Sequence, residues 1–561
     1  MKLKFAFLYF VLIFSIENLH SQSNWIWSKS SQTIGNGIGN ICLSVATDAN
    51  GNIIVTGRFG SSSIKFGSIT LVNANSSGFT DDFFIVKYDS SGNVLWAKRA
   101  GGSYLDGGLG VCTDSNGNIF ATGYFLSGTI IFGSDTLTNS PPQHGGSEIF
   151  IVKYDPNGNV LWAKSVQGVS SDWGFSVSAD PSGNVFVTGE FNSDTLYFGS
   201  SVIVTKTSST ASFVAKYDPN GNILWAKSNI GTANSNDGGF SVSSDRFGNA
   251  FVVGHFASLT ATFGTTTLIN SATSGSFDFF IAKYDPNGNV LWAKSTSGTE
   301  DETGYSVSTD AAGNAYVTGN YISPTMNFGS IVLTNVSNFG NVFVVKYEAS
   351  GGVAWATSSQ GSTNSDAGYS ISVNTAGDVF VTGGFASDTI SFGSQILIPP
   401  INSLTQFVAT YDPNGNILCA TYLINGGGGV TALAADPFGN AAVVGNFIIT
   451  PFIVGSDTLV LTSHQETFVS KYRCDNNVGI HEIGNGENIS IYPNPSNGIF
   501  TLNSQSAKGE IYIYNLLGEV IYKSKMNSSV SRIDLSEHAN GIYFVRVISG
   551  SEIYSGKLLK Q

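Results

Sequence analysis

The sequence predicts an all-β protein, a seven-bladed β-propeller followed by a small C-terminal β-sandwich. The motif DPNGNVLWAK at 155–164 returns with small changes every sixty-odd residues. Glycine and aromatic residues are abundant among the 561 residues, with 66 Gly, 39 Phe and 22 Tyr, whereas only 12% are charged. No long stretch has the apolar spacing of a helix, so short strands between turns are expected throughout.

Each copy of the motif predicts a β-hairpin. In Asp155-Pro156-Asn157-Gly158, proline presets the φ of a turn and glycine takes the left-handed conformation that closes it. The flanking segments 149–154 and 159–164 are rich in β-branched and aromatic residues, which favour strands. Six copies carry a tryptophan and one carries a cysteine at its place: Trp27, Trp96, Trp162, Trp225, Trp292, Trp355 and Cys419.

Each repeat contains four strand signals, seen in the fifth repeat at 304–310, 314–321, 341–347 and 352–357. The second and third are joined by a long Ser/Thr/Asn-rich loop that carries a Phe-Gly pair. Four antiparallel strands make one propeller blade, because so apolar a sheet needs neighbours on both faces. The seventh repeat lacks a fourth strand, and NWIWSK at 24–29 is expected to supply it and close the ring.

Across 22–473 the repeats resemble the bacterial β-propeller repeats known as SBBP repeats. The resemblance lies in the patterns D-x-x-G-N, V-T-G-x-F and K-Y-D-x-x-G-N-x-x-W-A-K. It implies the propeller fold and says almost nothing about activity, because folds do not dictate function.

Residues 1–21 have the layout of a secretory signal peptide. Lys2 and Lys4 precede an apolar run over 5–16, and Ser21 offers a cleavage point. The run is too short to span a bilayer, and no later segment is apolar enough to do so. The alternative is an apolar β-strand. We expect an exported monomer that begins near Gln22 and has no transmembrane helix after signal removal.

Residues 474–488 form a Gly/Asn/Glu-rich linker, and 489–561 form a second β domain whose alternating apolar pattern predicts a small sandwich. This domain resembles the type A C-terminal sorting domain of the type IX secretion system. The resemblance is carried by Tyr492, Pro493, Asn494, Pro495, Gly498, Gly518, Gly541 and Tyr543. It implies export across the outer membrane by that machinery, then cleavage and surface anchoring or release. The alternative is an ordinary sandwich without a sorting role.

The charge and the cysteines limit the function classes. A net charge of −13 argues against nucleic-acid and anionic-membrane binding, which need clustered Lys and Arg. Cationic or neutral partners remain, including a glycan or protein ligand. Four cysteines do not make a disulfide framework. Cys42, Cys112 and Cys419 are expected to be small buried hydrophobic residues, with a Cys419–Cys474 bridge as the alternative.

Two sets of residues are candidate binding sites. The first lies where the first strand of each repeat starts: Asn40, Asp106, Asp172, Asp237, Glu302, Asp366 and Gly428. If the first strand is innermost, five acids ring one mouth of the central channel and could bind a cation or a polyhydroxylated ligand. Alternatively, each carboxylate accepts N–H bonds within its own loop, which its repetition favours.

The second set lies at the end of the second strand, between a recurring glycine and a recurring aromatic residue, and its side chain differs from repeat to repeat. Its members are Arg58, Tyr124, Glu190, His255, Asn320, Gly384 and Asn446. Variable side chains on a rigid repeat scaffold are how repeat folds present a binding surface. Drift of surface residues explains the same variety equally well.

Signatures of enzymes are weak. The six histidines lack metal-ligand spacing, and there is no G-x-S-x-G motif and no EF-hand loop. The hairpin turns depart from the Asp-box of sialidases, and the four propeller arginines lie at unlike places in their repeats. We expect a secreted binding or adhesion protein with no cofactor. The alternative is a carbohydrate-active enzyme, a hydrolase or lyase, with a site at the channel mouth.

Overall fold

The computed structural model describes residues 24–75, 80–139, 146–204, 210–231, 236–271, 275–361, 364–399, 405–423, 428–474, 489–504, 508–515, 519–549 and 552–561. The chain divides into two compact units, Met1–Asp475 and Asn476–Gln561. The expected signal peptide and nearly all of the expected linker lie outside the described residues. No helix in the described ranges is long and apolar enough to cross a membrane.

The first unit contains seven antiparallel sheets, each built on a path of four strands, within the residues that the structure describes. The first strands are β2(Gln32–Thr47), β7(Asp106–Thr113), β13(Asp172–Ala179), β20(Asp237–Ser244), β26(Glu302–Thr309), β33(Asp366–Val373) and β39(Gly429–Ala435). The second strands are β3(Ile53–Phe66), β8(Ile119–Phe125), β14(Val185–Phe191), β21(Ala250–Phe256), β27(Ala315–Tyr321), β34(Val379–Phe385) and β40(Asn440–Phe447).

The third and fourth strands complete these sheets, which we call blades one to seven in chain order. The third strands are β5(Asp82–Tyr88), β11(Glu148–Tyr154), β17(Ala211–Tyr217), β24(Asp278–Tyr284), β30(Asn341–Tyr347), β37(Thr405–Tyr411) and β43(Glu466–Arg473). The fourth strands are β6(Val94–Ala100), β12(Val160–Val166), β18(Ile223–Ser228), β25(Val290–Ser295), β31(Val353–Ser358), β38(Ile417–Leu423) and, from the other end of the chain, β1(Trp25–Ser30).

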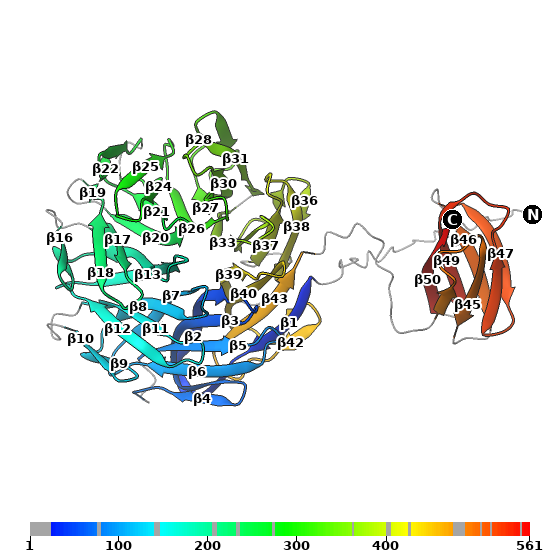
Figure 1. The fold of residues 1–561 in the computed structure, drawn as a ribbon, viewed down its shortest axis with the longest axis horizontal. Helices are drawn as coiled ribbons and strands as arrows, with labels where there is room; N and C mark the ends of the chain where they lie inside the picture. Colours follow the sequence, from blue (N-terminus) through cyan, green and yellow to red (C-terminus); the bar gives the residue numbers. More distant parts are fainter. Residues whose placement is uncertain are drawn as a thin grey trace, which may run out of the picture. The chain divides into compact units, whose positions relative to one another are not determined.

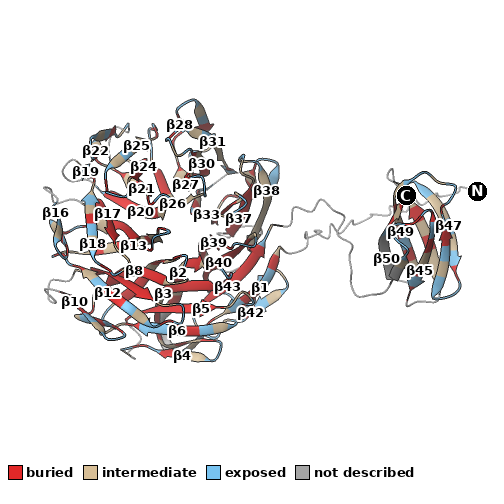
Figure 2. Cartoon of the chain, in the orientation of Figure 1, coloured by how far each residue is buried: buried red, intermediate tan, exposed pale blue. Residues whose placement is uncertain are grey.

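The blades form a closed ring with their first strands innermost (Figure 1). Each first strand contacts the first strand of the next blade, and β39 contacts β2. The all-β propeller class predicted from the repeats is thus confirmed. The apolar residues of neighbouring sheets pack between the blades, where the second and third strands are almost wholly buried (Figure 2).

The connection between second and third strands is a hairpin in most blades, where the sequence suggested a loop. These hairpins are β9(Thr129–Phe132) with β10(Asp135–Thr138), β15(Thr195–Phe198) with β16(Ser201–Val204), β22(Thr260–Phe263) with β23(Thr266–Ile269), β28(Thr325–Phe328) with β29(Ile331–Thr334), β35(Ile390–Phe392) with β36(Gln395–Leu397), and β41(Phe452–Val454) with β42(Asp457–Leu459). In blade one, β4(Ile69–Val72) pairs with the end of β3. The short strands β19(Ile230–Gly231) and β32(Gln360–Gly361) add to two hairpins. The Phe-Gly phenylalanines of these segments, such as Phe132, are buried in the blade cores.

Neighbouring blades are joined by a repeated polar link. In six of the seven blades, the tryptophan of the fourth strand donates its indole N–H to a turn carbonyl of the next blade, as in Trp96 to Pro156 at 3.1 Å. The same bond runs from Trp27, Trp162, Trp225, Trp292 and Trp355 to Ser90, Pro219, Pro286, Ala349 and Pro413, respectively. A lysine of the third strand reaches the same carbonyl and, in most blades, an aspartate at the end of the first strand. Lys87, for example, lies 3.0 Å from Asp48.

Blade seven is built from both ends of the chain, as the sequence predicted. β1 pairs antiparallel with β43, and the Trp25 ring meets the Tyr472 ring edge-on at 5.2 Å. Because the chain is cut between these strands, blade seven has no turn there to receive an indole from blade six.

A disulfide stands at that interface. Cys419 replaces the tryptophan of blade six and is bonded to Cys474, which directly follows β43, with a Cα–Cα distance of 5.9 Å. The expectation that Cys419 is merely a buried hydrophobic residue is wrong, and its alternative is correct. Cys42 and Cys112 are free thiols.

The second unit is a small sandwich of two sheets. One contains β44(Ile489–Tyr492), β45(Ile499–Ser504) and β48(Val530–Asp534), and the other contains β46(Gly509–Tyr514), β47(Val520–Met526), β49(Gly541–Ser549) and β50(Glu552–Lys560). Apolar residues of both sheets, such as Phe500, Ile513 and Val545, form its core.

The disulfide generates a stability prediction. Changing both Cys419 and Cys474 to Ser should lower the free energy of unfolding by about 2–4 kcal/mol, because the cross-link no longer restricts the unfolded chain. Chemical denaturation under oxidising conditions measures the change. Cys112→Ser, which removes a free thiol, is the control, and an unchanged midpoint in the double variant would contradict the role given to the bridge.

Candidate ligand-binding site

The acids at the start of the first strands are buried inside their own blades. Asp106, Asp172, Asp237, Glu302 and Asp366 are each no more than 1% exposed. Asp106 accepts hydrogen bonds from the Ser127 hydroxyl at 2.6 Å and from two backbone N–H groups of 126–127. Equivalent serines bond the other acids: Ser193, Ser258, Ser323 and Ser387.

These carboxylates therefore fasten the start of the first strand to the end of the second. The expectation that they present a ring to a ligand at the channel mouth is corrected, since no carboxylate of the set is accessible. Their repetition signalled the structural alternative, and the serine partner is the residue that sequence reasoning missed. Asn40 takes the same place in blade one, where it bonds Ser61.

Burial without countercharge raises the pKa of several of these acids. It raises the pKa of Asp106 to about 7, and of Asp172 and Asp366 to about 6. The effect is largest at Glu302, whose pKa rises to about 8 through burial and the nearby carboxyls of Asp278 and Asp301. Glu302 and Asp278 lie in adjacent blades, so one proton shared between them spares the structure a pair of buried like charges.

The variable set at the ends of the second strands lies near the blade interfaces. Arg58 is ion-paired with Asp81 at 2.9 Å and donates to the Tyr124 hydroxyl of the next blade at 3.3 Å. Tyr124 is largely buried. These two residues hold blades one and two together and leave little surface for a ligand.

Glu190 and His255 in the next two blades are different. Glu190 lies beside Trp173 across the strand pair, and burial raises the pKa of its carboxyl to about 7. Both ring nitrogens of His255 are buried with no hydrogen-bond partner in the described residues. Burial lowers the pKa of that imidazole to about 4, so it is neutral at pH 7.

The His255 ring is held by two phenylalanines. It stacks on Phe277, with 4.1 Å between ring centroids, and meets Phe240 edge-on at 4.9 Å. Gly238 is the strand partner of His255. A Cβ atom at Gly238 would lie 3.1 Å from Glu190 Oε2 and 3.2 Å from Phe240 Cζ. Glu190 and Phe240 thus approach one glycine at the interface of blades three and four, and His255 is its partner on the next strand.

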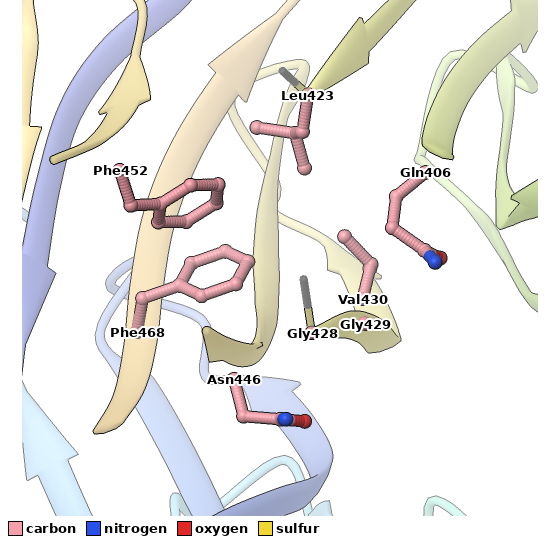
Figure 3. A pocket seen from close by; sticks show the side chains of 8 residues that line it. All are labelled: Gln406, Leu423, Gly428, Gly429, Val430, Asn446, Phe452 and Phe468. Atoms are coloured by element: carbon pink, nitrogen blue, oxygen red, sulfur yellow. The ribbon is translucent and has the colours of Figure 1, made fainter. Parts of the chain in front are cut away.

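The remaining members of the variable set are less informative. Asn320 lies beside Gly340 of its own blade, and Gly384 has no side chain. Asn446 borders a small hollow between blades six and seven (Figure 3), lined by Gln406, Leu423, Gly428, Gly429, Val430, Asn446, Phe452 and Phe468. The hollow exists where Gly428 replaces the buried acid of other blades, and its size suits about one water molecule.

An aromatic arc on the inner strands was missed by the sequence analysis. Every first strand has a β-bulge three residues after the acid position, and the extra residues are Leu43, Leu109, Phe175, Phe240, Tyr305, Tyr369 and Thr431. Four consecutive blades carry an aromatic residue there. Successive ring centroids are 5.7 Å apart from Phe175 to Phe240, 5.9 Å from Phe240 to Tyr305 and 6.1 Å from Tyr305 to Tyr369.

The arc is partly open to solvent. Phe175, Phe240 and Tyr305 are half-buried, and Tyr369 is 40% exposed. Because the first strands are innermost, the arc lies along the inner edge of blades three to six. It could hold the flat apolar face of a ligand, with Glu190 and His255 close by as polar groups. No three His, Cys, Asp or Glu side chains gather to hold a metal ion in the part of the chain that is described.

The residues that resemble a sorting signal cluster at one end of the sandwich. The Asn494 side chain bonds the backbone of Lys557 and Leu559, at 2.6 and 2.8 Å. Gly498 has a φ of 118°, and a Cβ there would lie 2.9 Å from the Ser536 Cα. Tyr543 donates its hydroxyl to the Ala539 carbonyl.

The other residues that resemble a sorting signal are more exposed or lie outside the described residues. Tyr492 is exposed and, with Pro493 and Pro495, flanks Asn494 in the segment between β44 and β45. Gly541 begins β49 with a positive φ. Gly518 lies outside the described residues.

The pKa of Glu302 generates a pH prediction. Between the ordinary pKa of 4.5 and the raised value of about 8, the folded state holds a proton that the unfolded state lacks. Stability is therefore lost as the pH rises through this window. Glu302→Gln keeps an acceptor for Ser323 without the charge, so it should exceed the parent in stability at pH 9 by more than ~1 kcal/mol, with little difference at pH 5.

Melting curves from pH 5 to pH 9 check this expectation. The exposed Glu300→Gln serves as the control and should follow the parent at every pH. Parallel curves for Glu302→Gln and the parent would show that Glu302 is charged in the folded state throughout.

Comparison with known proteins places the second unit. Residues 490–561 match the family described as "Secretion system C-terminal sorting domain". The chain is 27% identical over 501 residues to the uncharacterized WD repeat-containing protein L264 of Acanthamoeba polyphaga mimivirus, covering 74% of this chain and 36% of that protein. It is 25% identical over 113 residues to the regulatory protein FlaEY of Caulobacter vibrioides, covering 20% and 12%. The chain thus spans well under half the length of either relative.

Solved structures are more distant. Sqt1 from Chaetomium thermophilum is 10% identical with a TM-score of 0.38, covering 81% of this chain and 99% of that one. PorZ of Porphyromonas gingivalis, described as an essential bacterial surface component of the type-IX secretion system, is 11% identical with a TM-score of 0.14, covering 95% and 100%. What the family match establishes is that the chain ends in a secretion system C-terminal sorting domain, which directs it through the type IX secretion system to the cell surface or the extracellular space.

Proposed function

We propose that this protein is a binding or adhesion protein outside the cell, in which a propeller of SBBP-type repeats presents a ligand site. A signal peptide at 1–21 would first bring the chain into the periplasm, and the C-terminal domain would then engage the type IX machinery. The propeller is the cargo, and its ligand is a glycan or a protein.

The observation that carries the proposal is the concentration of irregular side chains on one part of a regular scaffold. Around most of the ring, polar groups are used in repeated internal bonds. At blades three and four, however, both ring nitrogens of His255 are buried without a hydrogen-bond partner in the described residues, and the partly exposed carboxyl of Glu190 lies beside the same aromatic arc. Groups that no internal contact explains, set on a rigid inner edge, are what a binding site offers.

A carbohydrate-active enzyme is the second candidate, supported by a single feature. Burial raises the pKa of the Glu190 carboxyl to about 7, which suits a general acid. Most glycoside hydrolases need a second carboxyl near the first. The nearest buried acids in the set, Asp172 and Asp237, are already bonded to serines, which favours binding over catalysis.

The export and adhesion functions can be tested together in cells. We expect the full chain to be labelled by antibody on intact cells, and to increase attachment to glycan- or protein-coated surfaces relative to cells without the gene. A chain that lacks 489–561 should be labelled only after the outer membrane is permeabilised, and should not support attachment, because its propeller stays in the periplasm.

Two outcomes would count against the proposal, each against a different part. Normal surface labelling of the truncated chain would show that the C-terminal domain is not needed for export. Surface labelling of the full chain without any gain in attachment would contradict the adhesion function. The variant Tyr197→Ala, on the outer hairpin of blade three, controls for loss of an exposed aromatic side chain unrelated to the site.

A further inference from the structure

The polar groups at blades three and four have the chemistry of hydroxyl recognition. A neutral imidazole offers one N–H donor and one acceptor, and both are unsatisfied at His255 in the described part of the chain. A carboxylate at Glu190 offers further acceptors. A ligand bearing several hydroxyl groups can donate and accept at the same site, whereas a purely apolar or purely cationic ligand would leave one side of the imidazole unpaired.

Space for such a group is provided by the sequence of the inner strand. Gly238 stands where blade three has Trp173, and Glu190 Oε2 and Phe240 Cζ both approach the point that a Cβ of Gly238 would occupy. A side chain at this position would press on both groups. The glycine therefore leaves the point between Glu190 Oε2 and Phe240 Cζ free of a side chain, next to its strand partner His255.

The apolar partner of the site is the aromatic arc. Phe240 belongs both to the arc and to the His255 cluster, so polar groups and stacked rings are continuous. The arc continues through Tyr305 to the more exposed Tyr369 in blade six. Aromatic rings pack well against the C–H faces of sugars, and an arc across several blades suits a ligand with several linked units.

The net charge of the chain distinguishes among the extended ligands that could stack on the aromatic arc. Nucleic acids also stack on aromatic rings, but they need clustered Lys and Arg, and this chain has a net charge of −13. Anionic polysaccharides meet the same objection. A neutral oligosaccharide does not.

We propose that the inner edge of blades three to six binds a neutral oligosaccharide, which stacks on Phe175, Phe240, Tyr305 and Tyr369 and hydrogen-bonds to Glu190 and His255. The proposal rests on the binding function proposed above and names its ligand and its contacts. Arg58, Tyr124 and the five buried acids take no part in it.

The test uses the full chain on an array of neutral oligosaccharides of two to six units, followed by calorimetric titration of the best binder. We expect at least a tenfold loss of affinity in Tyr305→Ala and in His255→Ala, and a smaller loss in Glu190→Gln, which keeps one acceptor. Tyr197→Ala on the outer hairpin is the matched control and should bind like the parent. Melting temperatures verify that each variant is folded.

Gly238→Ala provides a second, independent variant that removes no ligand contact. Its added Cβ narrows the space between Glu190 and Phe240, so the affinity should fall although every recognition side chain is retained. If Tyr305→Ala and Gly238→Ala both bind as the parent does, the site is not on this inner edge.

Other outcomes separate this inference from the proposed function. Attachment of cells to protein-coated surfaces, with no binding to any neutral oligosaccharide, would overturn the ligand class and leave the adhesion function standing. Titration with tetramethylammonium tests the cationic alternative, and saturable binding that Glu190→Gln abolishes would overturn the oligosaccharide in favour of a cation. Absence of both attachment and oligosaccharide binding would overturn the two proposals together.

Discussion

The propeller depends on one polar link that every blade except blade six makes to the next. An indole N–H and a lysine ammonium group converge on a turn carbonyl of the neighbouring blade, as Trp96 and Lys87 do on Pro156. These bonds require the turn to hold its carbonyl at a fixed position. The glycine of the motif ensures this by adopting the left-handed conformation, with a φ of 81° at Gly158. The motif at 155–164 is thus a hairpin and half of a blade-to-blade joint.

The chain ends require a different solution at one interface. Blade seven takes its outer strand from the N-terminal end, so the turn that should accept a bond from blade six is absent. The Cys419–Cys474 bridge stands at that place, replacing a hydrogen bond worth about 1 kcal/mol with a covalent one. The loss of the tryptophan in blade six and the presence of a cysteine after β43 therefore belong together. Both occur at the interface where the chain leaves the ring after β43.

Much of the propeller fold could be predicted from the sequence, because residues that recur in every repeat indicate the same backbone geometry in every blade. The turn residues, the strand alternation and the displaced strand at 24–29 lead to the ring without knowledge of any contact. The hydrogen-bond partners of individual polar side chains could not be predicted in the same way. Asp106 and Tyr124 were candidate ligand residues, yet Asp106 bonds Ser127 of its own blade and Tyr124 accepts a hydrogen bond from Arg58 of the neighbouring blade. The aromatic arc escaped notice because a β-bulge, invisible in a strict two-residue alternation, sets its residues on the inner edge.

The departures from the repeat are consequently the informative part of this molecule. Asp172, Ser193 and Trp162 have counterparts in most blades and serve the scaffold, so their chemistry says little about a ligand. Glu190 and His255 occupy the same repeat position as Arg58, which has internal partners, whereas the buried ring nitrogens of His255 have none among the described residues. A buried polar group without a partner destabilises a fold by about 1–3 kcal/mol. The His255 imidazole, beside the Glu190 carboxyl of the adjacent blade and an open aromatic surface, is best explained by a partner that arrives from outside.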